Sequence, residues 1–163
     1  MTDTTLVAPA GTKTGTVWIW LIVLLPLLSI SSLFLIDVTG YVRELVTDPT
    51  SLAALFSLYV SPGFLITLGL SLVLYALTVI FAVRDHQTLV QRGVPRPFHW
   101  GFAFFGPVVY TIGRSVVVKI RTGQGLGPLW GAIAVFGVSM IVSLAWTVWL
   151  TQAVYTMVPT VVP

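Results

Sequence analysis

The sequence contains no cysteine and very few charged side chains, and each shortage removes a class of protein. Without cysteine there can be no disulfide, thiol catalysis, iron–sulfur cluster or cysteine zinc site. Charged residues make up 8% of the chain and hydrophobic residues 56%, whereas soluble domains carry about 25% charged residues. We therefore expect an integral membrane protein, because one soluble core could not cover this much apolar surface.

The sequence contains three long uncharged runs. The runs over about 17–36, 62–83 and 129–151 are each long enough, as helices, to cross a hydrocarbon core of about 30 Å. Residues 1–16 are polar, and we expect a flexible tail there. The sequence thus predicts an all-α integral membrane protein, with three transmembrane helices in a single helical membrane domain over 17–163.

The connector after the first run is the one acidic stretch of the sequence. Residues 37–50 contain three acidic side chains and a single arginine, which places this connector on the non-cytoplasmic side. A helix start signal at 48–51 precedes apolar residues at helical spacing, namely Leu52, Leu55, Phe56 and Tyr59. We expect a short amphipathic surface helix here.

Segment 97–118 is aromatic and apolar, with Gly106 and Pro107 in its middle, and its course stays open between a re-entrant and a crossing fourth helix. If it crosses, the basic residues divide equally between the two sides of the membrane. If it is re-entrant, every basic residue except Arg43 lies on one side. Because cytoplasmic loops carry an excess of Lys and Arg, this asymmetry favours the re-entrant course and a cytoplasmic N-terminus.

Two stripes of small or hydroxylated residues recur every four positions on the predicted spans. Such stripes allow helix backbones to approach closely, or they line a polar path for a solute. Neither stripe contains Asp or Glu, which favours helix packing, with the two stripes facing each other. The residues are Gly63, Thr67, Ser71 and Tyr75 on the second span, and Ser139, Ser143, Thr147 and Thr151 on the last.

The triplet Arg84, Asp85 and His86 holds every side-chain type needed for proton transfer, at the end of the second span. A solvated helix end explains it as well, because a histidine needs a placed partner to act. The only other histidine, His99, has no ligand periodicity with His86. We therefore expect no metal site, no cofactor and no catalytic residue.

Four residues are candidates for contact with lipid or a partner, namely the aromatic Trp100 and the basic Arg114, Lys119 and Arg121. Arg114 serves either as a charge anchored at the headgroups or as a bidentate phosphate site. The glycines of 123–128 lack the lysine and hydroxyl residue of a phosphate-binding loop and indicate a turn.

Four motifs mark the second half of the chain. They are Asp85-x-x-x-Leu89-x-x-x-Gly93, Pro97-x-x-Trp100, Pro107-x-x-Tyr110-x-x-x-Arg114 and Gly125-x-Gly127-Pro128-Leu129-Trp130. Together, over roughly 83–150, this part resembles a C-terminal membrane module of small uncharacterised actinobacterial membrane proteins. The resemblance implies a bacterial cytoplasmic membrane and no particular chemistry.

The sequence therefore favours a non-catalytic accessory or scaffolding subunit that packs against a larger bacterial membrane complex or against itself. Its partners would be the lipid bilayer and another membrane protein or further copies of the chain, and not nucleic acid. A small transporter or channel subunit is the alternative. No nucleophile with a base and no carboxylate pair stands out, so we do not expect an enzyme.

Overall fold

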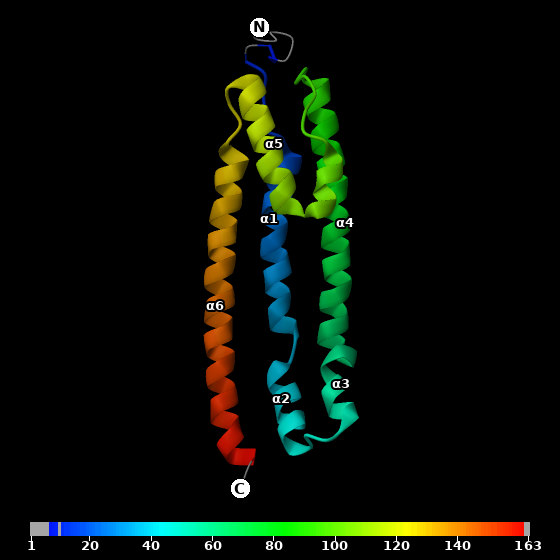
Figure 1. The fold of residues 1–163 in the computed structure, drawn as a ribbon, viewed down its shortest axis with the longest axis vertical. Coiled ribbons are helices and arrows are strands. Elements are labelled where there is room, and N and C mark those ends of the chain that lie inside the picture. The colour runs from blue at the N-terminus through cyan, green and yellow to red at the C-terminus, as the bar shows by residue number, and fades with distance from the viewer. Residues whose placement is uncertain (1–6, 10, 162–163) are drawn as a thin grey trace. The chain divides into compact units, whose positions relative to one another are not determined.

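The computed structural model describes residues 7–9 and 11–161, without the side chains of 157–161. The described chain is helical, with no strand among these residues. Its order is α1 (Val17–Ser31), η2 (Ser32–Leu35), α2 (Val38–Thr47), α3 (Leu52–Val60), α4 (Pro62–Gln91), η3 (Trp100–Phe105), α5 (Pro107–Thr122) and α6 (Gly127–Val161) (Figure 1). The predicted all-α class is confirmed.

Three stretches of the described chain are long and apolar enough to cross a membrane. They are Val17–Thr47, Pro62–Gln91 and Gly127–Thr156, and they contain the three runs on which the prediction rested. The first is not one regular helix, because α1 ends at Ser31 and a 3₁₀ turn follows. The three predicted spans thus correspond to three helical stretches that suit a bilayer.

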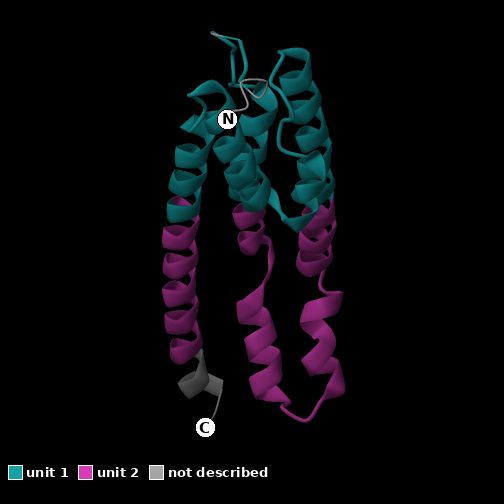
Figure 2. Cartoon of the chain, turned by 45° about the horizontal axis from the view of Figure 1, so that its top comes forward, with its two compact units in different colours: residues 1–27, 73–137 teal, residues 28–72, 138–163 magenta. Residues whose placement is uncertain are grey.

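The chain divides into two compact units, coloured separately in Figure 2. Unit 1 consists of residues 1–27 and 73–137, and unit 2 of residues 28–72 and 138–163. Both α4 and α6 begin in one unit and end in the other.

Unit 1 holds two small hydrophobic clusters. The first joins Ile19 and Ile22 of α1 to Ala82, Ala103 and Tyr110. The second consists of Leu89, Val94 and Val118. Inward positions on α4 recur at helical spacing (Leu74, Thr78, Ala82, Asp85 and Leu89), so a carboxylate occupies a place in an otherwise mostly apolar stripe.

The segment between α4 and α5 doubles back along α4. The Phe98 carbonyl lies 2.9 Å from the His86 ring, and the Phe104 carbonyl accepts a hydrogen bond from Tyr75 at 3.2 Å, so the chain runs antiparallel to α4. Gly106 then turns with φ of 107°, a value that favours glycine. From Pro107 at the first helical position, α5 returns toward the C-terminal end of α4 (Figure 1).

This course differs from a single aromatic helix over 97–118. Proline and glycine break the segment: η3 is a short 3₁₀ helix, and α5 begins only at Pro107. Gly113 of α5 lies directly against the Phe98 ring, where a Cβ atom would not fit. The two arms of the hairpin can pack closely because that position has no side chain.

Unit 2 contains the short helices α2 and α3. Asp37 accepts a hydrogen bond from Gly40 N at the start of α2, and Ser51 accepts one from Ala54 N at the start of α3. The predicted amphipathic helix corresponds to α3, which leaves Leu52, Phe56 and Tyr59 exposed. Side-chain caps of this kind satisfy the free N–H groups at a helix start.

Candidate functional site: a buried ion pair

A carboxylate and a guanidinium meet inside unit 1, and both side chains are completely buried. Arg114 Nε lies 3.1 Å from Asp85 Oδ2, and Arg114 Nη2 lies 3.4 Å from Asp85 Oδ1. The two nitrogens therefore face both carboxylate oxygens. Burying either charge alone would cost free energy, because the charge leaves water, and the opposite charge beside it offsets part of that cost.

Further donors complete the shell of Asp85. Tyr110 OH donates to Oδ2 at 2.9 Å, and Thr16 Oγ1 donates to Oδ1. Tyr110 and Arg114 are four residues apart on α5, so they project from the same helix face. Tyr110 is fully buried, and its hydroxyl donates to the carboxylate as a neutral phenol does.

The start of α1 is connected to the same carboxylate. Thr16 immediately precedes α1, and its Oγ1 accepts a hydrogen bond from Ile19 N at 3.2 Å. The same hydroxyl donates to Asp85, so one side chain caps α1 and contacts α4. This capping interaction fixes where the first helix begins relative to the ion pair.

The residues before α1 form what we call the N-terminal strap (residues 11–16). Arg114 Nη2 donates to the Thr14 carbonyl at 2.5 Å. Arg92 Nη1 donates to the carbonyls of Lys13 at 3.0 Å and of Gly15 at 2.8 Å. Two arginines from two other helical regions thus hold the backbone of the strap, and Thr14 and Thr16 are buried.

The strap lies within the predicted flexible tail over 1–16, and its backbone accepts hydrogen bonds at Lys13, Thr14 and Gly15, while the flexibility of the tail stays a prediction. Polar composition suggested a loose segment, but backbone carbonyls can accept hydrogen bonds whatever their side chains are. Residues 1–6 and 10 of that predicted tail lie outside the described part. Among the described ones, Ala8 N also donates to the Arg121 carbonyl at 2.9 Å.

Asp85 also departs from the expected solvated helix end. Arg84 is exposed and His86 half-buried, whereas Asp85 points inward and is fully enclosed. A triplet of polar residues looks solvated in sequence, but successive residues on a helix are about 100° apart. One of three neighbours can therefore face the interior while another faces outward.

Arg114 is not placed as a headgroup anchor would be. A snorkelling side chain keeps its charge at the surface, whereas the Arg114 guanidinium is enclosed and bound to Asp85 and Thr14. Lys119 is exposed and donates to the Gly123 carbonyl at 2.6 Å, while Trp100 and Arg121 are half-buried. These predicted contact residues do not converge on Arg114 as one ligand site.

The two hydroxyl stripes make separate contacts. On α4, Gly63 lies against the Leu35 backbone, Thr67 Oγ1 donates to the Ser32 carbonyl at 3.3 Å, and Tyr75 contacts Phe104. The hydroxyls of Ser71, Thr147 and Thr151 instead donate to carbonyls one turn back in their own helices. The predicted face-to-face packing of the stripes is replaced, for Gly63 and Thr67, by packing on the segment 32–35. Ser139 and Ser143 are half-buried on α6.

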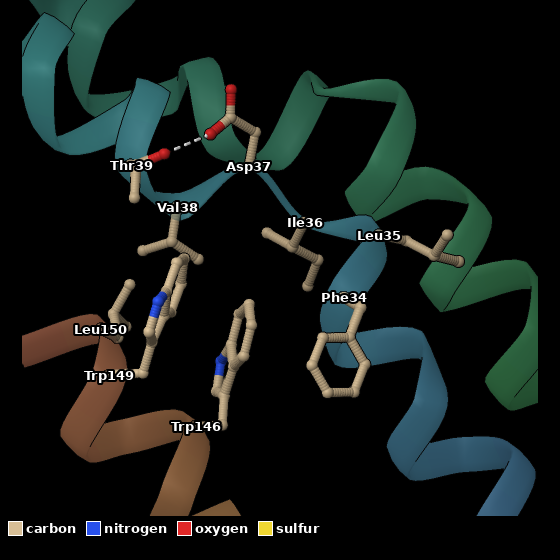
Figure 3. Close-up of a pocket in the computed structure, with 9 residues that line it drawn as sticks. All are labelled: Phe34, Leu35, Ile36, Asp37, Val38, Thr39, Trp146, Trp149 and Leu150. Carbon is tan, nitrogen blue, oxygen red and sulfur yellow. Dashed lines mark hydrogen bonds between the residues drawn. The ribbon is translucent and has the colours of Figure 1, made fainter. Parts of the chain in front are cut away.

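A groove of about 260 Å³ lies in unit 2, between the end of η2 and α6. Figure 3 shows Trp146 and Trp149 of α6 side by side, opposite Phe34, Ile36 and Val38. The two indole rings stack with centroids 4.9 Å apart. The Asp37 carboxylate accepts hydrogen bonds from Thr39 Oγ1 and Gly40 N, each at 2.8 Å, so it acts as a helix cap at the edge of the groove.

The ion pair and the groove differ in the groups that line them. Within the described chain, no group of three His, Asp or Glu side chains could hold a metal ion. The Asp85 carboxylate is surrounded by donors from its own chain, whereas Arg114 Nη1 is buried without a hydrogen-bond partner among the described residues. The ion pair and its hydrogen bonds join the strap, α1, α4 and α5 at one point.

Comparisons with models of known families, with curated proteins and with solved structures found no match. The resemblance of the part around 83–150 to an actinobacterial membrane module therefore stays a prediction.

Proposed function

We propose that this chain is a non-catalytic accessory or scaffolding subunit of a bacterial cytoplasmic membrane. It would pack against a larger membrane complex or against copies of itself. The resemblance over about 83–150 supports the bacterial location, and the three long apolar stretches support the membrane.

The closed Asp85–Arg114 pair is the observation that carries this proposal. Transporters and channels use ionisable groups that face a water-filled path and change partner or protonation. Here both groups are fully buried and bind each other, a threonine hydroxyl, a tyrosine hydroxyl and a backbone carbonyl. Such a set fixes helices relative to one another and favours a structural role over a polar path.

The last helix supplies the surface for a partner. Of an apolar 18-residue window in each long stretch, 28% is buried in Val17–Thr47, 11% in Pro62–Gln91 and none in Gly127–Thr156. Phe136, Ile141 and Leu144 are each more than half exposed. A helix with so little packing of its own has area available for another membrane helix.

The orientation follows from charge. The described part of unit 1 carries exposed cations (Lys13, Arg84, Arg92, Arg96 and Lys119), and that of unit 2 carries exposed acids (Asp37, Glu44 and Asp48). With the hairpin of η3 and α5 as a re-entrant element, the cations lie in the cytoplasm together with the N-terminus. Exposed Phe102, Phe104 and Phe105 near the Gly106 turn suit insertion into lipid.

The test asks whether the chain is part of a larger assembly in its native membrane. The tagged full chain is extracted in mild detergent, and its mass is measured by native mass spectrometry. We expect a species heavier than one chain. Gly137→Leu on α6 should reduce that species strongly, because a Cβ at Gly137 meets no atom within 4 Å and the new side chain would project outward.

Gly69→Leu on α4 is the matched control, since its Cβ also meets nothing within 4 Å. It should leave the heavy species intact. Two results together would replace the scaffold proposal with the transporter alternative. The first is that native extracts contain only the single chain. The second is that liposomes with the chain alone show solute flux, and that Asp85→Asn abolishes this flux.

A further inference from the structure

A groove runs along one side of α4 in unit 1, separate from the ion pair. It measures about 340 Å³ and is lined by Val79, Ile80, Val83, Arg84 and Gln87. These residues are spaced by one and three positions, so they share one face of the helix. Ile80, Arg84 and Gln87 are exposed, which leaves the groove open to the surroundings.

The lining changes character along the helix axis. Val79, Ile80 and Val83 belong to the uncharged run of α4, and Arg84 is the first charged residue after it. From Ile80 to Gln87 the helix advances about 10 Å. The groove therefore passes from an apolar part to a part with a guanidinium and an amide, as expected where a helix leaves the hydrocarbon for the headgroup layer.

The charge around the groove favours an anion. Asp85 is the only acidic side chain in the described part of unit 1, and Arg114 neutralises it. The exposed cations of this unit thus have no carboxylate of their own unit among the described residues. A phosphate monoanion would complement Arg84, and the Gln87 amide would add a second donor beside it.

We propose that this groove holds one anionic phospholipid of the bilayer. The Arg84 guanidinium and the Gln87 amide donate hydrogen bonds to its phosphate, and an acyl chain lies along Val79, Ile80 and Val83. A lipid fits better than free phosphate, because free phosphate would use only the polar end of the groove. This assignment goes beyond the proposed function and requires only that the chain lies in a bilayer.

The experiment titrates the purified full chain with phosphatidylglycerol or with phosphatidylcholine and counts bound lipids by native mass spectrometry. The wild type should bind phosphatidylglycerol more tightly. Arg84→Gln should weaken phosphatidylglycerol binding about fivefold, as expected for one cation at the headgroup level, and should leave phosphatidylcholine binding unchanged. Ile80→Trp, which fills the apolar part, should weaken both.

Arg96→Gln is the matched control, because it removes one exposed cation of the same unit at another place. It should change phosphatidylglycerol binding less than twofold. Equal losses in Arg84→Gln and Arg96→Gln would mean diffuse attraction and overturn the site. So would equal affinity for the two lipids in wild type, or displacement of phosphatidylglycerol by equimolar inorganic phosphate. Circular dichroism of each variant verifies folding.

Discussion

The two units differ in where they keep their charges and in what holds them together. Unit 1 buries a carboxylate and a guanidinium between two hydrophobic clusters and ties a strap to them. In the described part of unit 2, only Ser32 and Ala54 are buried, and the acids stay exposed. Unit 2 relies instead on close backbone approach at Gly63 and on aromatic contacts such as Phe34 with Trp146.

The difference matters because the two kinds of contact tolerate change differently. A buried ion pair is strict, since losing one partner leaves an uncompensated charge. Packing of apolar side chains in lipid is more permissive, because the bilayer is as apolar as the residues it replaces. Unit 1 should therefore respond sharply to single substitutions at its centre, and unit 2 mainly to changes that force backbones apart.

The largest expected effect concerns the sidedness of the charges. Because the chain has no cysteine, single variants Gln91→Cys, Gln124→Cys and Thr50→Cys can be labelled without background. We expect an impermeant thiol reagent to reach 91 and 124 only from the cytoplasmic side, and 50 only from the other. Labelling of positions 91 and 124 from opposite sides would show that segment 97–118 crosses the membrane. The cations of unit 1 would then not all lie on one side.

The next effect concerns Arg114. Arg114→Ala leaves Asp85 buried without its counter-ion, and we expect the free energy of unfolding to fall by about 3–5 kcal/mol. Denaturant titration of the purified chain in micelles measures this. Arg114→Lys should also destabilise, because one ammonium cannot reproduce contacts made by two nitrogens to Asp85 and one to Thr14.

Arg43→Ala in unit 2 is the control for Arg114. Arg43 is exposed, so its removal should change the free energy of unfolding by no more than about 0.5 kcal/mol. Equal losses at Arg43 and Arg114 would remove the distinction between a strict and a permissive unit.

Tyr110→Phe tests the shell of Asp85 with a smaller change. It deletes a hydrogen bond to a charged acceptor, which is worth about 1.5–3 kcal/mol. Tyr75→Phe deletes a hydrogen bond from an exposed tyrosine to the Phe104 carbonyl and should cost about 1 kcal/mol or less. Thermal unfolding followed by circular dichroism compares the two. A larger loss at Tyr75 would place the critical contact in the hairpin arm instead.

Two glycines of α4 in unit 2 should respond to the same substitution with effects of opposite sign. Gly63→Ala pushes a methyl group into the Leu35 backbone and should destabilise by about 1–3 kcal/mol. Gly69→Ala meets nothing within 4 Å and should stabilise by about 0.5–1 kcal/mol, because alanine is the better helix former. The measurement is the change in the free energy of unfolding, which should have opposite signs in the two variants. Equal signs would contradict the close approach.

The helical class and the three apolar stretches could be predicted from sequence because hydropathy over about 20 residues is a strong signal. The ends were less accurate. The uncharged run 17–36 looks like one helix, yet α1 stops at Ser31, where a 3₁₀ turn takes over. Hydropathy indicates whether a segment prefers an apolar environment, and it does not indicate the local pattern of backbone hydrogen bonds.

The ion pair and the strap were each missed for a physical reason. Asp85 and Arg114 are 29 positions apart, and only the fold of the hairpin brings them together. The strap was missed because its acceptors are backbone carbonyls, which every residue has. One signal was available: Asp85 falls on the same helical face as Leu74, Thr78, Ala82 and Leu89, and that spacing predicts an inward carboxylate in need of a partner.

The bond between Arg114 and the Thr14 carbonyl spans 100 positions of the chain, and this separation has a consequence for biosynthesis. At about 5–20 residues per second, a ribosome makes the arginine roughly 5–20 s after the threonine. During that interval the start of the first helix lacks its final partner, and later Asp85 emerges without its counter-ion. The ion pair and its bond to the strap can therefore form only after α5 has been made.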